Sequence, residues 1–216
     1  MTQAIIQTEN LSFEADGQEI LKDINLQVNE GDFITIMGAS GSGKSTLLKL
    51  IGLQINLSSG SIYFKGKNIQ DYNPMDYRKK VSYFFQSAVL FGKTVRDNLA
   101  FPSEIRDEEF DEKQAIEHLK EVQLSADYID KKVNDLSGGE KQRVALIRNM
   151  LYPPKVLLMD EVTSSLDQEN RENILAYVQR LNQKNNTTIL WVTHNQDEID
   201  ASDRLIHIVD GKLEEK

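Results

Sequence analysis

The sequence predicts an α/β fold built on a mostly parallel sheet, because strand-length apolar segments alternate with segments of helical periodicity. Strands are expected at 33–37, 156–160 and 188–193. The run 156–160 is continuously apolar up to its final aspartate, which is typical of a strand buried on both faces. A helix is expected between the last two strands, with an apolar side formed by Ile174, Val178 and Leu181. In such sheets ligands bind at the carboxyl ends of the strands.

An antiparallel β subdomain is expected at the N-terminus. Within residues 1–30, apolar side chains stand among polar neighbours in the pattern of half-buried strands: Ile20, Ile24, Leu26 and Val28. After a turn at 58–60, further strands are expected at 61–64 and 81–85. Asp210 and Gly211 predict a hairpin turn close to the C-terminus.

The segment of about 88–151 predicts a helical lobe inserted in the α/β core. Five carboxylates would share one first helical turn, where they complement the partial positive charge of a helix N-terminus: Asp107, Glu108, Glu109, Asp111 and Glu112. A second helix with one apolar face would carry Val144, Ile147 and Leu151. We therefore expect a single domain, in which 1–87 and 152–216 form the core with its β subdomain.

The chain of 216 residues is acidic, with 25 lysines and arginines against 34 aspartates and glutamates and a formal net charge of −9. This balance argues against nucleic acid as a partner, because contacts to a phosphate backbone need a basic surface. The N-terminus lacks a secretory signal and no apolar stretch is long enough to span a membrane, so we expect no direct membrane insertion. The absence of cysteine excludes disulfides and thiolate metal sites.

Residues 38–45 form a complete phosphate-binding motif, G-x-x-x-x-G-K-[ST], between an expected strand and an expected helix. The backbone N–H groups of this loop would converge on a phosphate. Lys44 would contact the outer phosphates, and the Ser45 hydroxyl would bind Mg²⁺. The expected ATP-binding set in this region is Gly38, Ala39, Ser40, Gly41, Ser42, Gly43, Lys44, Ser45 and Thr46.

Asp160 and Glu161 are adjacent carboxylates at the end of a buried strand. Consecutive strand residues point to opposite sides, so the two side chains need not share one task. We assign Asp160 to the Mg²⁺ shell and Glu161 to the orientation of the attacking water. The alternative is an acidic pair that caps the following helix.

A second motif, LSGGEKQR at 136–143, completes a pattern that covers nearly the whole chain. The elements of this pattern, in one family's order and spacing, are 38–45, Gln86, 136–143, 156–161, SSLD at 164–167, and His194. With them the chain resembles the nucleotide-binding domain of an ATP-binding cassette (ABC) transporter. LSGGE is the specific part, because other phosphate-loop enzymes such as nucleotide kinases lack it. The resemblance implies hydrolysis of ATP with Mg²⁺.

The resemblance also implies that two copies face head to tail, so that the LSGGE segment of one copy closes over the ATP of the other. Ser137, Gly138 and Gly139, with Glu140, would receive the outer phosphate at a helix N-terminus. The same residues fit a helix cap with Ser137 at N-cap and Glu140 at N3. The two interpretations are compatible, because a cap that is open on one side is an anion site.

Four further positions take their roles from the resemblance. His194 matches a switch histidine at the γ-phosphate, although a lone histidine at a strand end is more often a buried structural residue. Gln86 matches a glutamine that links Mg²⁺ to the membrane partner, and Asp167 matches an aspartate that organises the opposed site. Phe13 falls where an aromatic ring stacks on adenine, with a core aromatic as the alternative. The expected catalytic set is Lys44, Gln86, Glu161 and His194.

Within the family, four segments resemble the bacterial Fet-type ATP-binding subunits of iron export: 89–107, 136–150, 154–167 and 190–199. We therefore expect an ATPase subunit that powers a separate integral membrane permease, bound to it at the cytoplasmic face of the cell membrane. Only three histidines and no cysteine are present, so any metal selectivity would reside in the permease.

An apolar group around Gln86 is the expected docking site for a short permease helix: Phe84, Phe85, Val89, Leu90, Phe91 and Val95. Two other functions stay open from the sequence. One is a soluble ABC ATPase that acts on nucleic acid or ribosomes, which the acidic charge disfavours. The other is an ATP-dependent clamp whose turnover is incidental.

Overall fold

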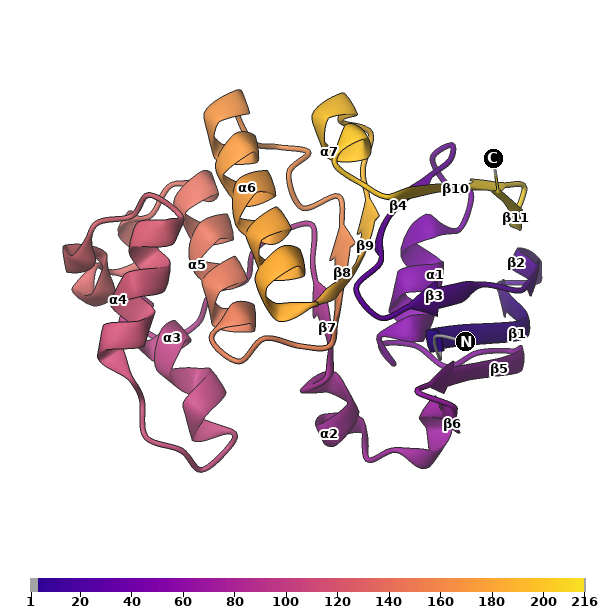
Figure 1. The fold of residues 1–216 in the computed structure, drawn as a ribbon, viewed down its shortest axis with the longest axis horizontal. Coiled ribbons are helices and arrows are strands. Elements are labelled where there is room, and N and C mark those ends of the chain that lie inside the picture. The colour runs from indigo at the N-terminus through magenta and orange to yellow at the C-terminus, as the bar shows by residue number, and fades with distance from the viewer. Residues whose placement is uncertain (1–3, 216) are drawn as a thin grey trace.

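The computed structural model describes residues 4–215. Their strands form two sheets, one of six strands and one of five. The larger sheet has the order β11-β10-β4-β9-β8-β7 and lies at the centre of the molecule (Figure 1). Its strands are β4 (Phe33–Met37), β7 (Val81–Phe84), β8 (Val156–Asp160), β9 (Thr188–Val192), β10 (Arg204–Val209) and β11 (Lys212–Glu215). Every neighbouring pair is parallel except the β10–β11 hairpin, which turns at Asp210 and Gly211 as predicted.

The N-terminal antiparallel subdomain is confirmed and lies on the right in Figure 1. It contains β1 (Ala4–Ala15), β2 (Gln18–Ile24), β3 (Gln27–Asn29), β5 (Ser59–Phe64) and β6 (Lys67–Asn68). Strand β5 begins at Ser59 rather than Ser61, because Ser59 still pairs with Ser12 of β1. The predicted turn at 58–60 is therefore partly strand.

The central sheet is buried on both faces, as the apolar run of β8 predicts. Val156 and Leu158 pack into one hydrophobic cluster, shared with the β subdomain and α1 (Lys44–Ile51). Leu157 and Met159 pack into a second cluster, shared with the helices on the other face. This alternation follows the two-residue period of a strand and fixes the side on which each residue at the end of β8 emerges.

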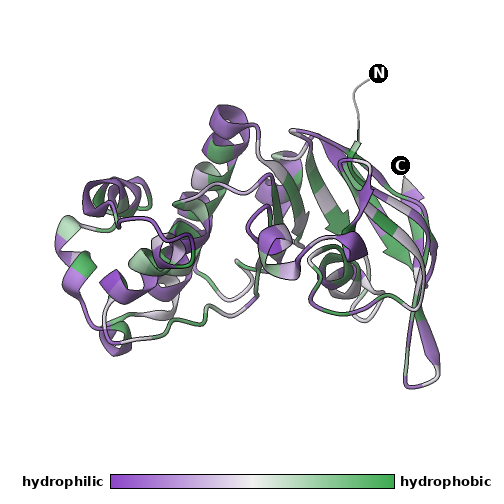
Figure 2. Ribbon diagram, turned by 90° about the horizontal axis from the view of Figure 1, so that it is seen from below, coloured by the Kyte–Doolittle hydropathy of each residue, from purple (hydrophilic) through white to green (hydrophobic). Residues whose placement is uncertain are grey.

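Between β7 and β8 the chain is mainly helical, and these helices lie on the left in Figure 1. They are α3 (Val95–Glu104), α4 (Glu112–Glu121) and α5 (Gly138–Met150), joined by 3₁₀ turns at Ala126–Asp130 and Val133–Asp135. The remaining helices are α2 (Pro74–Arg78), α6 (Gln168–Asn185) and α7 (Gln196–Asp200), with a 3₁₀ turn at Ile69–Asp71. Figure 2 shows strongly hydrophobic residues in the strands and mixed colouring along the helices. None of the helices in the described part of the chain is long and apolar enough to cross a bilayer.

The predicted helical turn shared by five acidic residues is wrong for its first three members. Asp107 has a left-handed φ of 55°, and its N–H and that of Glu108 bond back to Glu104 and Ser103 at the end of α3. Helix α4 begins only at Glu112, with Asp111 as its N-cap. The acidic composition therefore spans a helix end, a connection and the start of the next helix.

Candidate nucleotide-binding site

The loop between β4 and α1 has the backbone that a phosphate cradle requires. Gly38 and Gly43 have left-handed φ values of 149° and 105°. A Cβ atom on Gly38 would lie 2.3 Å from the Ile208 carbonyl oxygen, and one on Gly43 would lie 2.6 Å from Cδ2 of Leu21. Both conformation and space therefore demand glycine at these two positions.

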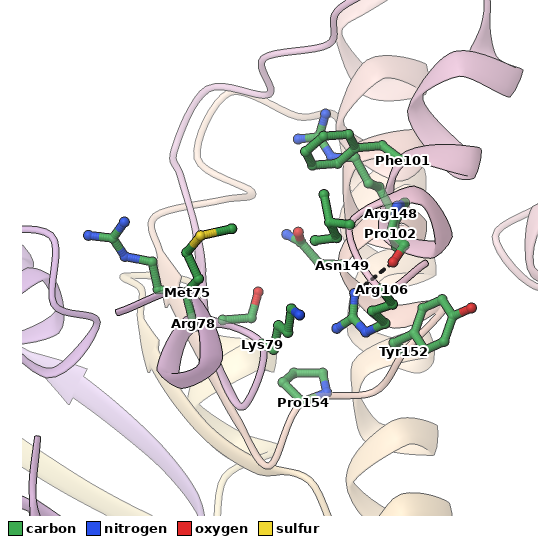
Figure 3. Close-up of a pocket in the computed structure, with 12 residues that line it drawn as sticks. Met75, Arg78, Lys79, Phe101, Pro102, Arg106, Arg148, Asn149, Tyr152 and Pro154 are labelled. Carbon is green, nitrogen blue, oxygen red and sulfur yellow. Dashed lines mark hydrogen bonds between the residues drawn. The ribbon is translucent and has the colours of Figure 1, made fainter. Parts of the chain in front are cut away.

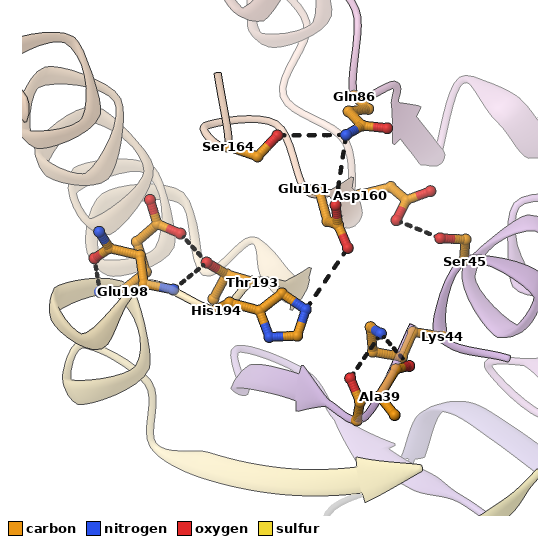
Figure 4. A network of polar contacts seen from close by, with 12 residues as sticks. Ala39, Lys44, Ser45, Gln86, Asp160, Glu161, Ser164, Thr193, His194 and Glu198 are labelled. Atoms are coloured by element: carbon orange, nitrogen blue, oxygen red, sulfur yellow. Dashed lines mark hydrogen bonds and ion pairs between the residues drawn. The ribbon is translucent and has the colours of Figure 1, made fainter. Parts of the chain in front are cut away.

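Lys44 and Ser42 equip this loop for an anion. The Lys44 ammonium donates to the carbonyl oxygens of Gly38 and Ala39 at 2.8 and 2.9 Å, so it reaches back across the loop (Figure 4). The Ser42 hydroxyl is buried and has no hydrogen-bond partner among the described residues. A cation and an unpaired buried donor, in a glycine-rich loop at a helix N-terminus, fit the phosphates of a nucleotide.

Ser45 and Asp160 supply the donors expected of a Mg²⁺ site. The Ser45 hydroxyl donates to Oδ1 of Asp160 at 2.8 Å, across the gap between α1 and β8 (Figure 4). Asp160 has the same strand parity as Val156 and Leu158, which explains why it emerges on the α1 side. Hydroxyl and carboxylate oxygens are hard ligands, and Mg²⁺ takes few of them from protein when phosphates and water complete its shell. The described residues contain no cluster of three or more metal-ligating side chains.

Tyr83 belongs to this site, and the sequence interpretation missed it. Its buried hydroxyl donates to Oδ2 of Asp160 at 2.6 Å. Burial raises the pKa of the Tyr83 hydroxyl and the bond to Asp160 raises it further, so the group stays a donor. Because β7 pairs with β8, residue parity along β7 could have placed Tyr83 on the α1 side once that pairing was known.

Glu161 turns away from Asp160. It is a non-glycine residue with a φ of 50°, and its N–H bonds to the Val192 carbonyl oxygen at the end of β9. A left-handed conformation at such a residue is uncommon and is held here by the surrounding strands. Its carboxylate lies 3.8 Å from Nε2 of His194 and 3.4 Å from Nε2 of Gln86 (Figure 4). The two adjacent carboxylates therefore face different groups.

His194 is not a buried structural histidine, because 56% of its side chain is exposed. With Glu161 it lines a hollow of about 260 Å³ that is open to solvent. Its loop is fixed from behind: the Thr193 hydroxyl donates to Oε2 of Glu198 and accepts from the N–H of Asn195. Glu198 is buried on α7, and burial raises its pKa. Glu198 is a second residue that the sequence interpretation missed.

Gln86 lies at the end of β7, but its contacts differ from those expected. Its amide donates to Glu161 and to the Ser164 hydroxyl, both at 3.4 Å. The described residues include no hydrogen bond from Gln86 to Ser45 or Asp160. Its role at Mg²⁺ therefore stays a prediction.

The LSGGE segment forms the predicted helix cap. Ser137 is the N-cap of α5: its hydroxyl accepts from the Glu140 N–H at 3.2 Å, and the Glu140 carboxylate accepts from the Ser137 N–H at 2.7 Å. Glu140 also accepts from Tyr128 and Lys131. Burial opposes ionisation of Glu140, but these hydrogen bonds outweigh it and lower its pKa to about 2. Within residues 4–215 no hydrogen bond joins this segment to the phosphate loop.

Asp167 and Phe13 have structural tasks within one copy. Asp167 is the N-cap of α6 and accepts from the Asn170 N–H at 2.9 Å. That bond, with the side-chain bonds of Asn170, lowers the pKa of Asp167. Phe13 lies on β1, half-buried against the first hydrophobic cluster. Stacking of Phe13 on adenine stays a prediction.

Comparison with known proteins decides the family. The family model described as "ABC transporter" matches residues 21–164, which include the phosphate loop, the LSGGE segment and both carboxylates. The chain belongs to the ABC transporter family. Within that family it is an ATP-binding subunit, and its enzymatic activity is ATP hydrolysis.

Curated relatives of this ABC subunit include transporters with different stated substrates. The chain is 42% identical over 202 residues to the "Probable iron export ATP-binding protein FetA" of Escherichia coli, covering 94% of this chain and 90% of that protein. It is 38% identical over 219 residues to the "Spermidine/putrescine import ATP-binding protein PotA" of Mycoplasma capricolum, covering all of this chain but 62% of that protein.

Two solved structures share the fold of this ABC subunit. One is a dimeric, post-hydrolysis state of an ATP-binding cassette bound to ADP and Pi, with a TM-score of 0.86 and 31% identity over 97% of this chain and 98% of that chain. The other is a bacterial ABC exporter with ATP bound, with a TM-score of 0.87 and 27% identity, covering all of this chain and 39% of that chain.

Proposed function

We propose that two copies of this subunit bind two ATP molecules between them, each held by the phosphate loop of one copy and closed by Ser137–Gly139 of the other. The carrying observation is that the phosphate loop is complete, whereas the capped tip of α5 makes no hydrogen bond to it among the described residues. A helix N-terminus with free amides is an anion site without a ligand in its own chain. The solved cassette with ADP and Pi, at 31% identity, is dimeric, which supports the association of two copies.

The chain's own residues divide the work of hydrolysis. The loop 38–45 holds the phosphates, with Lys44 on the outer ones, and Ser45 and Asp160 hold Mg²⁺, with Gln86 as a further group at that ion. When bound, Mg²⁺ neutralises charge on the phosphates. Glu161 orients the attacking water and accepts its proton, and the exposed His194 donates to the outer phosphate. Phe13 stacks on adenine from the edge of the β subdomain.

Sedimentation of the Glu161→Gln variant tests this arrangement. This variant keeps the phosphate loop but lacks the carboxylate that activates water, so it should bind ATP, hydrolyse it at least about 100-fold more slowly and accumulate as a dimer. Adding Ser137→Arg to it should abolish the dimer while ATP still binds to the single copy. A Glu161→Gln protein that stays monomeric at saturating ATP would refute the shared site.

We propose that an integral membrane permease docks in a groove beside Gln86. Six of the seven large apolar side chains exposed among the described residues line it: Met75, Phe85, Val89, Phe91, Phe101 and Ile105. Part of the groove is a pocket of about 270 Å³ between α2 and the helices α3 and α5 (Figure 3). Its rim is basic in an acidic protein and carries Arg78, Lys79, Arg106 and Arg148.

This groove refines the docking site expected from the sequence. Phe84 and Val95 are buried and are not free for a partner, whereas Leu90 is half-buried against the helical cluster. The apolar floor and basic rim fit a short amphipathic helix with acidic side chains. Met75→Glu should lower co-purification of the permease and its stimulation of ATPase activity, while basal hydrolysis is retained. Gln70→Glu, exposed and outside the groove, is the matched control.

We propose that the transported substrate is iron and that the direction is export. The subunit would bind its permease at the cytoplasmic face of the cell membrane. The 42% identity to FetA over 94% of the chain supports iron export, whereas the relatives named for spermidine and putrescine import share less identity and extend well beyond this chain. Iron efflux from loaded cells that express the subunit with its permease should require Glu161. Polyamine uptake that depends on Glu161, without iron efflux, would reassign the cargo.

A further inference from the structure

The two adjacent glycines of the LSGGE segment differ in what surrounds them. A Cβ atom on Gly138 would meet nothing within 4 Å. A Cβ atom on Gly139 would lie 2.9 Å from Cγ, 3.0 Å from Nδ2 and 3.1 Å from Oδ1 of Asn170 in the same chain. Gly138 is therefore open on its side-chain face, whereas Gly139 is a glycine because the amide of Asn170 occupies the space beside it.

Asn170 is held in this position by Asp167. Its Nδ2 donates to both carboxylate oxygens of Asp167 at 2.8 Å, and its backbone N–H donates to Oδ1 at 2.9 Å. The side chain cannot swing away from Gly139 without breaking the two Nδ2 bonds. The chain of contacts therefore runs from the tip of α5 through Asn170 to the N-cap of α6.

Two buried polar atoms beside this contact are unpaired. Asn170 Oδ1 and Arg143 Nε are both buried and have no hydrogen-bond partner among the described residues. Arg143 lies four residues after Gly139, on the same side of α5, and interacts electrostatically with Asp167. Unpaired buried polar atoms lower stability, so an asparagine at this place is not explained by stability alone.

We propose that Asn170 is a positioning residue that locks the tip of α5 to Asp167, so that Ser137–Gly139 and Asp167 meet the opposite copy as one rigid unit. The proposal rests on the shared ATP site proposed above. In it, the two helix N-termini approach the second nucleotide together, and loosening Asn170 separates them. Asn170 itself touches neither ATP nor the reacting atoms.

A double-mutant cycle in the Glu161→Gln background tests the lock, with the ATP concentration for half-maximal dimerisation as readout. Asn170→Ala and Gly139→Ala should each raise this concentration about 10-fold, the first by freeing the tip and the second by displacing the amide. The double variant should need no more ATP for half-maximal dimerisation than the single variant that dimerises less well, because the new Cβ at residue 139 then fills the space that the Asn170 amide has left. Asn170→Asp, which keeps the shape but loses the donor, should resemble Asn170→Ala.

The controls separate this effect from loss of folding. ATP binding by the single copy should change by less than about twofold in every variant, because the phosphate loop is untouched. Asn173→Ala removes the same side chain one turn along α6, where its Nδ2 donates to Oε1 of Gln123 at 3.2 Å, and should leave dimerisation unchanged. Additive effects of the Gly139 and Asn170 variants, or an Asn170→Ala protein that dimerises like Asn173→Ala, would overturn the proposal. A Glu161→Gln parent that never dimerises would overturn the shared site and the lock together.

Discussion

The Tyr83 hydroxyl donates a 2.6 Å hydrogen bond to Oδ2 of Asp160, while Ser45 donates to Oδ1 of the same carboxylate. The two bonds fix the rotation of the Asp160 side chain from both sides. The carboxylate proposed to hold Mg²⁺ is thus oriented by neighbouring elements, β7 and α1. Such second contacts are a general feature of metal sites that need a fixed geometry.

Tyr83→Phe should therefore slow hydrolysis without emptying the site. The substitution keeps the ring and removes one hydrogen bond, a loss of about 1 kcal/mol that corresponds to about a fivefold effect on rate. We expect the loss in kcat, with KM for ATP nearly unchanged and the Mg²⁺ concentration for half-maximal activity raised. Steady-state kinetics with titrated Mg²⁺ measure this. An unchanged Mg²⁺ dependence would show that Tyr83 does not orient Asp160.

Glu140→Gln should destabilise the protein at neutral pH and much less in acid. The hydrogen bonds of Glu140 lower its pKa from 4.5 to about 2 in the folded state, so its contribution is present above about pH 4.5 and is lost as the pH falls towards 2. We expect the variant to lose about 2 kcal/mol of unfolding free energy at pH 7. Urea unfolding of both proteins between pH 7 and pH 3 follows the difference. A constant difference over this range would contradict the assigned ionisation.

Glu198 should matter to His194 through its acceptor oxygen rather than its charge. Glu198→Gln keeps an acceptor for the Thr193 hydroxyl, whereas Glu198→Ala loses it. The alanine variant should lose about tenfold in kcat, the cost of about 1.4 kcal/mol in positioning, and the glutamine variant should retain most activity. Equal losses in both variants would indicate that the carboxylate itself takes part.

The raised pKa of Glu198 gives a second, independent readout. A buried carboxyl with a raised pKa stabilises the fold while it is neutral, and that stability is lost as the pH rises through the folded-state value. Glu198→Gln carries no such charge. Its melting temperature should therefore rise relative to that of wild type as the pH increases, which melting curves across a pH series would show; a variant that falls relative to wild type as the pH increases would contradict this.

Gly43→Ala should impair both folding and ATP binding, because its Cβ would collide with Leu21 in a left-handed backbone. We expect a loss of at least about 1 kcal/mol in unfolding free energy. Gly41→Ala is the matched control: Gly41 also has a positive φ, of 79°, but its Cβ would meet nothing within 4 Å. Comparable losses of stability in the two variants would show that the positive φ of the backbone, and not the contact with Leu21, causes the loss.

Local patterns predicted the elements whose causes are local. The continuous apolar run of β8, the cap at Ser137 and Glu140, and the hairpin at Asp210 each depend on residues close in sequence. The helical turn predicted from the acidic run that begins at Asp107 was wrong, because composition alone does not show where a residue with a left-handed backbone interrupts a helix. Tyr83 escaped notice because its partner Asp160 lies on another strand, and only the pairing of β7 with β8 brings the two together. Glu198 is only five residues from Thr193, but their contact depends on how α7 turns back on the end of β9.

Mixing two inactive variants tests the shared ATP site most directly. A Lys44→Ala copy keeps Ser137–Gly139 but lacks the phosphate-loop charge, and a Ser137→Arg copy has the opposite defect. If each site is built from two copies, random pairing makes one intact site in the mixed dimers, and turnover should recover to about a quarter of the wild-type value. A mixture no more active than the average of its two components would contradict the shared site.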